Sequence, residues 1–148
     1  MRRKFKISIP TFASAASKLD IEVRMAMLTA LRETGLPIAQ AESANANIAE
    51  SITIVLPYRY STGTSYSAGL RIPPKYAYVE RGTGIYAGHT SWDVEPKGKK
   101  ALQFADGSFS MHATIDGQPG RHFLQKGVAA ARQRFDEWCR LNLFKALL

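Results

Sequence analysis

Cysteine and long apolar runs are scarce in this sequence of 148 residues. Its one cysteine, Cys139, cannot form an internal disulfide, which is typical of a reducing compartment or of one where redox chemistry is irrelevant. No apolar run approaches the roughly 20 residues of a membrane-spanning helix. The basic start, residues 1–6, is not followed by an apolar segment of about 7–15 residues. We therefore expect neither a membrane helix nor a secretory signal.

Recognisable catalytic and metal-binding motifs are also missing. No Gly-x-Ser-x-Gly occurs, and Gly82-Thr83-Gly84 lacks the Gly-Lys-Ser/Thr that completes a phosphate loop. The histidines and the cysteine have no spacing typical of a zinc site: His89, His112, His122 and Cys139. The sequence thus predicts no enzymatic activity, no cofactor and no metal.

Positive charge is what the sequence has in excess. Lysine and arginine number 20 and aspartate and glutamate 12, so the formal net charge is +8. Such an excess is compatible with a nucleic-acid or anionic neighbour. Two clusters of cations are candidates for facing DNA without reading its bases. The first lies near the N-terminus and comprises Arg2, Arg3, Lys4 and Lys6. The second comprises Lys97, Lys99 and Lys100. A solvated basic N-terminal arm over residues 1–9 is the simpler explanation of the first cluster.

Apolar periodicity predicts a long N-terminal helix over residues 10–34, followed by a shorter one over 37–49. Gly35 and Pro37 are expected to separate the two helices. A final helix is predicted over 120–148.

Between the helices, β-branched and alternating segments predict strands at 51–56 and 66–72. A hairpin is predicted around Asp106-Gly107, with a type I′ turn. We expect one α+β domain over 1–148, in which the long N-terminal and C-terminal helices pack against an antiparallel sheet of about four strands. Residues 82–99 are expected to form a long loop.

Some apolar residues lie outside the predicted core faces. Ile21, Met25 and Leu28 form a second apolar set on the far side of the first helix, and the last turns of the chain are apolar nearly all round. Docking within the chain and contact with a partner both explain the apolar C-terminus. All six tyrosines lie between residues 58 and 86 among cations, a composition that suits a protein interface or base stacking. The candidate interface residues are Ile21, Met25, Leu28, Tyr78, Tyr86, Leu143, Phe144 and Leu147.

Three clusters in the second half form an ordered pattern: Tyr76–Gly84, Pro96–Phe104 and Gly117–Leu124. Gly82 and Gly84 permit a chain reversal where a Cβ would clash, and Gly120 permits a tight entry into the last helix. In order and spacing the clusters resemble the minor tail components of long-tailed bacteriophages, the tail-completion or neck proteins that help to join head to tail. The resemblance covers residues 76–128.

The resemblance implies a structural virion protein of the head-tail connector, which forms a ring through which DNA passes. It implies a homo-oligomer, six- or twelve-fold, that contacts head-closure (adaptor) and tail-terminator proteins and lies near packaged DNA. It further implies a location in the virion tail or neck, and in the host cytoplasm during assembly, with no membrane partner. A basic nucleic-acid-binding module is the alternative, supported by the N-terminal cations and the tyrosine-rich stretch.

Overall fold

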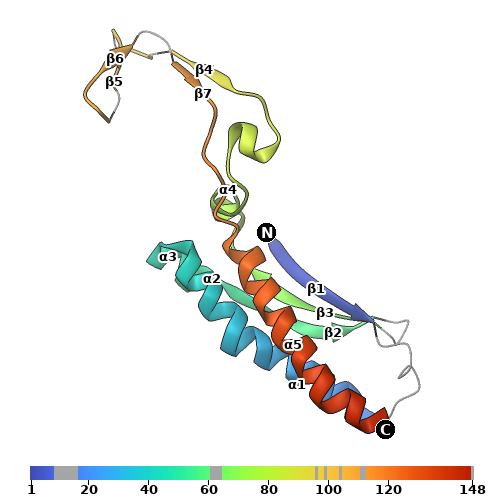
Figure 1. Cartoon of the computed structure of the whole chain (residues 1–148). Coiled ribbons are helices and arrows are strands. Elements are labelled where there is room, and N and C mark those ends of the chain that lie inside the picture. Colours follow the sequence, from blue (N-terminus) through green and yellow to red (C-terminus); the bar gives the residue numbers. More distant parts are fainter. Residues whose placement is uncertain are drawn as a thin grey trace. The chain divides into compact units, whose positions relative to one another are not determined.

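The computed structural model describes residues 1–8, 17–60, 65–95, 97–98, 100–103, 105–110 and 113–147 (Figure 1). For residues 8, 17–19, 92–94, 114–115 and 143–147 only the backbone is described. The chain is mixed α+β, as predicted, and divides into two compact units. The first comprises Met1–Ala77 and His122–Leu148, and the second comprises Tyr78–Arg121.

The first unit contains a three-stranded antiparallel sheet in the order β1-β3-β2. Strand β1 is Arg2–Ser8, and its register with β3, Ser65–Arg71, runs from Arg2 opposite Arg71 to Ser8 opposite Ser65. The expectation of a basic arm over residues 1–9 is therefore wrong for residues 2–8, which form a strand. Phe5, which alternates with the cations, is only 3% exposed, and its burial provides the apolar anchor that an arm would lack.

Strand β2 is Thr53–Arg59 and forms an edge of this sheet. The predicted strand began at Ser51 and ended before Pro57, whereas Ser51 ends a helix and Pro57 lies within β2. The register shifts between Val55 and Tyr58, so the proline lies at an irregularity of an edge strand. There its missing N–H removes no regular bond of the ladder.

One nearly continuous helical run replaces the two predicted N-terminal helices. Helix α1, Ser17–Ala30, leads through a π-helical turn, Leu31–Gly35, into α2, Leu36–Ser43. Gly35 has helical angles, φ −65° and ψ −50°, so the predicted break at this residue is wrong. Pro37 follows directly after the π-helical turn, where the Leu36 N–H already bonds to the Leu31 carbonyl five residues back, and such an irregularity of the helix accommodates a residue without an N–H.

The physical role of Gly35 is close helix packing. A Cβ built on Gly127, in helix α5 (Phe123–Leu147), would lie 2.5 Å from the carbonyl oxygen of Gly35. A Cβ on Gly35 would in turn lie 3.0 Å from the side chain of Ala131. The two glycines therefore let α5 approach the N-terminal helical run backbone to backbone.

Helix α2 ends at Ala44, a left-handed residue with φ 51°. A separate short helix, α3, follows over Ala46–Ser51, and the Asn45 side chain caps it by accepting hydrogen bonds from the backbone N–H groups of Asn47 and Ile48. The predicted helix over 37–49 is thus two helices.

The core of the first unit lies between the sheet and the helices. Val23, Met27 and Ala30 of α1 are buried, as the predicted stripe requires. The Phe5 and Phe135 rings lie 6.0 Å apart and join β1 to α5. The long N-terminal and C-terminal helices therefore pack against the same face of the sheet, which we call the covered face (Figure 1). Phe12 and Ala16 lie outside the described residues.

The second unit contains all but the first residue of short helix α4, Ala77–Arg81, and two pairs of short strands. Strand β4, Trp92–Val94, pairs with β7, Ala113–Ile115, and β5, Leu102–Gln103, pairs with β6, Phe109–Ser110. The expected single sheet of about four strands is therefore wrong. The segment 82–99, predicted as a loop, contains a 3-10 turn over Gly84–Ala87 as well as β4.

The predicted hairpin around Asp106-Gly107 is present as the β5–β6 pair. Its turn is not of type I′, because of the two central residues only Gly107 has a positive φ, 84°. The Asp106 carboxylate accepts hydrogen bonds from the backbone N–H and the hydroxyl of Ser108, and these hold the pKa of Asp106 below its ordinary value. The Asp106 side chain thus stabilises a turn that is longer than the expected two-residue loop.

Candidate interaction surfaces

The first candidate surface is an apolar groove between α1 and α5. It has a volume of about 340 Å³, and Met25, Ala30 and Trp138 are among its lining residues. Met25 is 55% exposed and neighbouring Ile21 60% exposed, while Leu28 is half-buried. Two of the three residues of the predicted second apolar set, Ile21 and Met25, are thus exposed to solvent. We call this surface the α1–α5 groove.

Polar contacts fix one side of this groove. The Arg134 guanidinium pairs with the Glu33 carboxylate and donates a hydrogen bond of 2.9 Å to the Thr34 hydroxyl. The Trp138 ring stacks on the buried Phe135 ring at 5.8 Å. An apolar floor held by core packing, with a polar rim, is the usual anatomy of a protein interface.

Of the predicted interface residues whose side chains the structure describes, only Met25 lines this groove; Ile21 and Leu28 lie on the same helix but are not among its lining residues. Tyr78 and Tyr86 lie in the second unit, where they are 55% and 53% exposed. The side chains of Leu143, Phe144 and Leu147 lie outside the described residues. Leu141, on the same helix, is exposed.

Two of the three clusters behind the phage resemblance, the first and the third, contact each other inside the second unit. The Thr83 backbone N–H donates to the Gln118 carbonyl at 2.8 Å, and the Gln118 N–H donates to the Thr83 hydroxyl at 2.9 Å. Gly82 and Gly84 have positive φ values of 86° and 60°, as the predicted chain reversal requires. A Cβ on Gly120 would lie 2.5 Å from the Glu80 carbonyl oxygen. The first and third clusters therefore hold this part of the unit together.

The second candidate surface is the face of the three-stranded sheet opposite α1 and α5, which we call the open face. Strand alternation places Arg2, Lys4 and Lys6 on it, all exposed. Arg3 is half-buried and alternates to the covered face, so it does not belong with the other three. In the second unit Lys97 and Lys100 are exposed, while Lys99 lies outside the described residues.

Two tyrosines lie beside the lysines of the open face. The Nζ atoms of Lys4 and Lys6 lie over the Tyr58 and Tyr60 rings, at 5.0 and 4.7 Å from the ring centroids. The two hydroxyls share a hydrogen bond of 2.9 Å. This bond, assisted by the Lys4 ammonium, lowers the pKa of Tyr58, and the same bond raises the pKa of Tyr60. The tyrosines therefore keep the ammonium groups in place without neutralising them.

Arg71 is a further exposed cation, and it is not among the predicted DNA-facing residues although it lies among the cations of the tyrosine-rich stretch. It lies opposite Arg2 across the β1–β3 pair. Both arginines line a cavity of about 470 Å³ at this end of the sheet, together with Thr53 and Pro74. Alternation within the predicted strand 66–72 was the signal that could have identified Arg71, because it sets this residue apart from Leu70 and Ile72.

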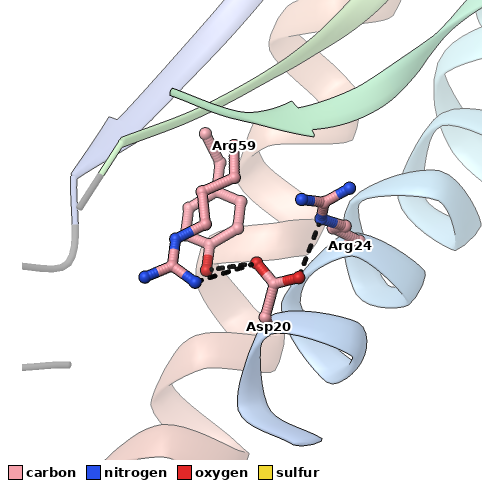
Figure 2. Close-up of polar contacts among 4 residues, drawn as sticks. Asp20, Arg24 and Arg59 are labelled. Carbon is pink, nitrogen blue, oxygen red and sulfur yellow. Dashed lines mark hydrogen bonds and ion pairs between the residues drawn. The ribbon is translucent and has the colours of Figure 1, made fainter. Parts of the chain in front are cut away.

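Tyr66 has a different environment from the other two tyrosines. Its hydroxyl donates a 2.9 Å hydrogen bond to the Asp20 carboxylate on the covered face, and Asp20 also pairs with Arg24 at 3.1 Å and with Arg59 at 3.7 Å (Figure 2). Burial, and secondarily the bond to Asp20, raises the pKa of Tyr66. This cluster links α1 to β2 and β3, which is a structural role.

The described residues contain no group of three or more histidine, cysteine, aspartate or glutamate side chains that could hold a metal ion. Burial, and to a smaller extent the Asp136 carboxylate, raises the pKa of the Cys139 thiol to about 11. The thiolate is therefore scarce at neutral pH. Within the part of the chain that the structure covers, none of the helices has the length and apolar character needed to cross a membrane.

No protein-family model, curated protein or solved structure matches this chain.

Proposed function

We propose that this chain is a structural subunit of a phage head-tail connector, a tail-completion or neck protein that assembles with its own copies into a ring. The observation that carries the proposal is the α1–α5 groove, where Met25 and Trp138 present an apolar surface to solvent. Exposed apolar patches rimmed by polar groups are typical of protein interfaces. The order of the three resemblance clusters supports the connector assignment within that class.

The second unit supports the same proposal. Tyr78, Ile85 and Tyr86 are each between 47% and 55% exposed there. Large apolar and aromatic side chains tend to carry most of the energy of an interface. A connector subunit needs more than one such surface, because it contacts both its own copies and its neighbours along the tail axis.

The experiment is the substitution Met25→Asp. A carboxylate in the groove would have to be desolvated on assembly, so the variant is expected to shift towards monomer in native mass spectrometry, while its circular dichroism stays nearly unchanged. Leu56→Asp is the matched control, because Leu56 is 65% exposed on β2, away from the groove. Loss of the fold in Met25→Asp would mean that this face belongs to the core.

The connector assignment itself is tested in particles. Electron microscopy of virions is expected to show the protein in the neck, and particles from a gene deletion are expected to lack joined tails. Absence of the protein from virions, together with normal tails after deletion, would falsify the assignment.

The alternative, a basic nucleic-acid-binding module, has one supporting observation of its own. The open face exposes Arg2, Lys4 and Lys6 on alternate positions of one strand. A nucleic-acid contact is compatible with either function, because a ring around packaged DNA also meets phosphates.

A further inference from the structure

The three strands of the first unit have an unbalanced charge. Strands β1, β2 and β3 together carry six cations and not one carboxylate. Arg59 is paired with Asp20 on the covered face. The cations exposed on the open side have no carboxylate on their own strands, and this charge favours a polyanionic partner.

The spacing of these cations suits a phosphate backbone. Side chains at alternate strand positions are about 6.7 Å apart, so Arg2, Lys4 and Lys6 span about 13 Å. One strand of B-form DNA presents about four phosphates over that length. Measured along the duplex axis, cations about 6.7 Å apart therefore coincide with every second phosphate of one strand.

The cavity at the end of the row provides a different donor set. Arg2 and Arg71 line it together with Thr53. Guanidinium groups bind phosphate oxygens in a bidentate manner, and a hydroxyl can add a further hydrogen bond. The cavity thus has the chemistry of a phosphate site, and it is continuous with the row of cations through Arg2.

The tyrosines favour a nucleic acid over other polyanions. Tyr58 and Tyr60 lie beside Lys4 and Lys6, with their rings 4.9 Å apart. Aromatic rings among cations are the usual components of a surface that follows a nucleic-acid backbone and contacts its bases. Two rings beside two lysines therefore suit a nucleic acid, whose bases can stack on rings while its phosphates meet cations.

We propose that the open face is a binding track for the sugar-phosphate backbone of a nucleic acid, running from the Arg2–Arg71 cavity along Lys4 and Lys6 beside Tyr58 and Tyr60. Binding is sequence-independent, because the contacts are made to phosphates. The track goes beyond the connector assignment, since it rests on the sheet of one subunit and does not require a ring.

The test is fluorescence anisotropy of the full chain with labelled DNA of mixed sequence, single-stranded and duplex, at about 0.05 and 0.2 M salt. The double variant Lys4→Gln/Lys6→Gln is expected to bind at least tenfold more weakly at the lower salt. The slope of log K against log salt should fall by about 2, because each lysine that no longer neutralises a phosphate lowers it by close to one. Arg71→Gln should lower the slope by about 1.

The matched control is Arg132→Gln/Arg140→Gln, which removes two exposed charges from α5. It should leave the slope nearly unchanged. An equal loss in this control would assign the effect to net charge and overturn the track. Absence of wild-type binding at the lower salt, or binding to phosphatidylserine vesicles but not to DNA, would also overturn it.

Failure of the track is distinguishable from failure of the connector proposal. The lysine variants leave the α1–α5 groove intact, so their oligomeric state should match the wild type. Met25→Asp should in turn retain the salt slope per subunit. Preference for the single-stranded or the duplex probe identifies which form the track accepts.

Discussion

The covered and open faces of the three-stranded sheet are built from the same strands yet have opposite chemistry. On β1, Phe5 is buried against α5, while Lys4 and Lys6 on either side of it are exposed. The charge cluster around Asp20 on the covered side is paired, whereas the open side has cations without carboxylates on its strands. A two-residue period thus gives one strand a buried apolar side and an exposed charged side.

The largest expected effect is on the covered face. Phe5→Ala removes a ring that is 3% exposed and lies 6.0 Å from the Phe135 ring, so it should lower the free energy of unfolding by about 3–5 kcal/mol. Urea denaturation monitored by circular dichroism measures this. Lys6→Ala, one residue away on the open face, is the matched control and should change the same quantity by about 0.5 kcal/mol or less. Equal effects would contradict the distinction between the faces.

A smaller effect is expected at the charge cluster of the covered face. Asp20→Asn weakens the contacts to Arg24, Arg59 and the Tyr66 hydroxyl, and should cost about 1–3 kcal/mol. Loss of the carboxylate should also lower the pKa of Tyr66 towards its ordinary value, because the Asp20 charge disfavours the phenolate. Ultraviolet titration of the tyrosines measures this shift.

The control for Asp20 is Glu22→Gln, which neutralises an exposed carboxylate on the same helix. It should leave both stability and the Tyr66 pKa nearly unchanged. A fall in the Tyr66 pKa in this control would mean that the summed negative charge of α1, and not the contact with Asp20, raises that pKa.

The smallest stability effect is expected on the open face. Lys4→Gln/Lys6→Gln should change the free energy of unfolding by about 1 kcal/mol or less, since it removes two exposed cation–π interactions and relieves one like-charge repulsion. The main cause of the lowered Tyr58 pKa, its bond to Tyr60, remains, but removing the Lys4 ammonium should raise that pKa. Substantial unfolding of the double variant would show that the open face is needed for stability.

Local patterns predicted several elements correctly. The stripe of Val23, Met27 and Ala30 identified the buried side of α1, and alternation around Leu70 identified β3. The glycines at 82 and 84 indicated backbone conformations that suit a residue without a Cβ, and their φ values are positive. Such patterns are readable because burial and backbone conformation depend on neighbours in the chain.

Other features depended on distant residues. Gly35 is a standard helix terminator, but here it lies within a helical run because Gly127, far along the chain, packs against it. The four cations near the N-terminus indicated a solvated arm, but residues 2–8 form a strand. Phe5 becomes a core residue only because this strand pairs with Ser65–Arg71 and the Phe5 ring contacts Phe135. Composition alone groups Arg3 with the neighbouring cations, whereas strand alternation places it on the opposite face.

The α+β class, the two long helices and the basic, cysteine-poor chemistry were determined by the sequence alone, because composition and periodicity are properties of the chain. Tertiary structure decided which strands share a sheet, how Arg71 joins Arg2 at one cavity, and which cations face solvent together. The reason is that strand pairing and helix crossing bring together residues many positions apart, and no local pattern specifies those partners.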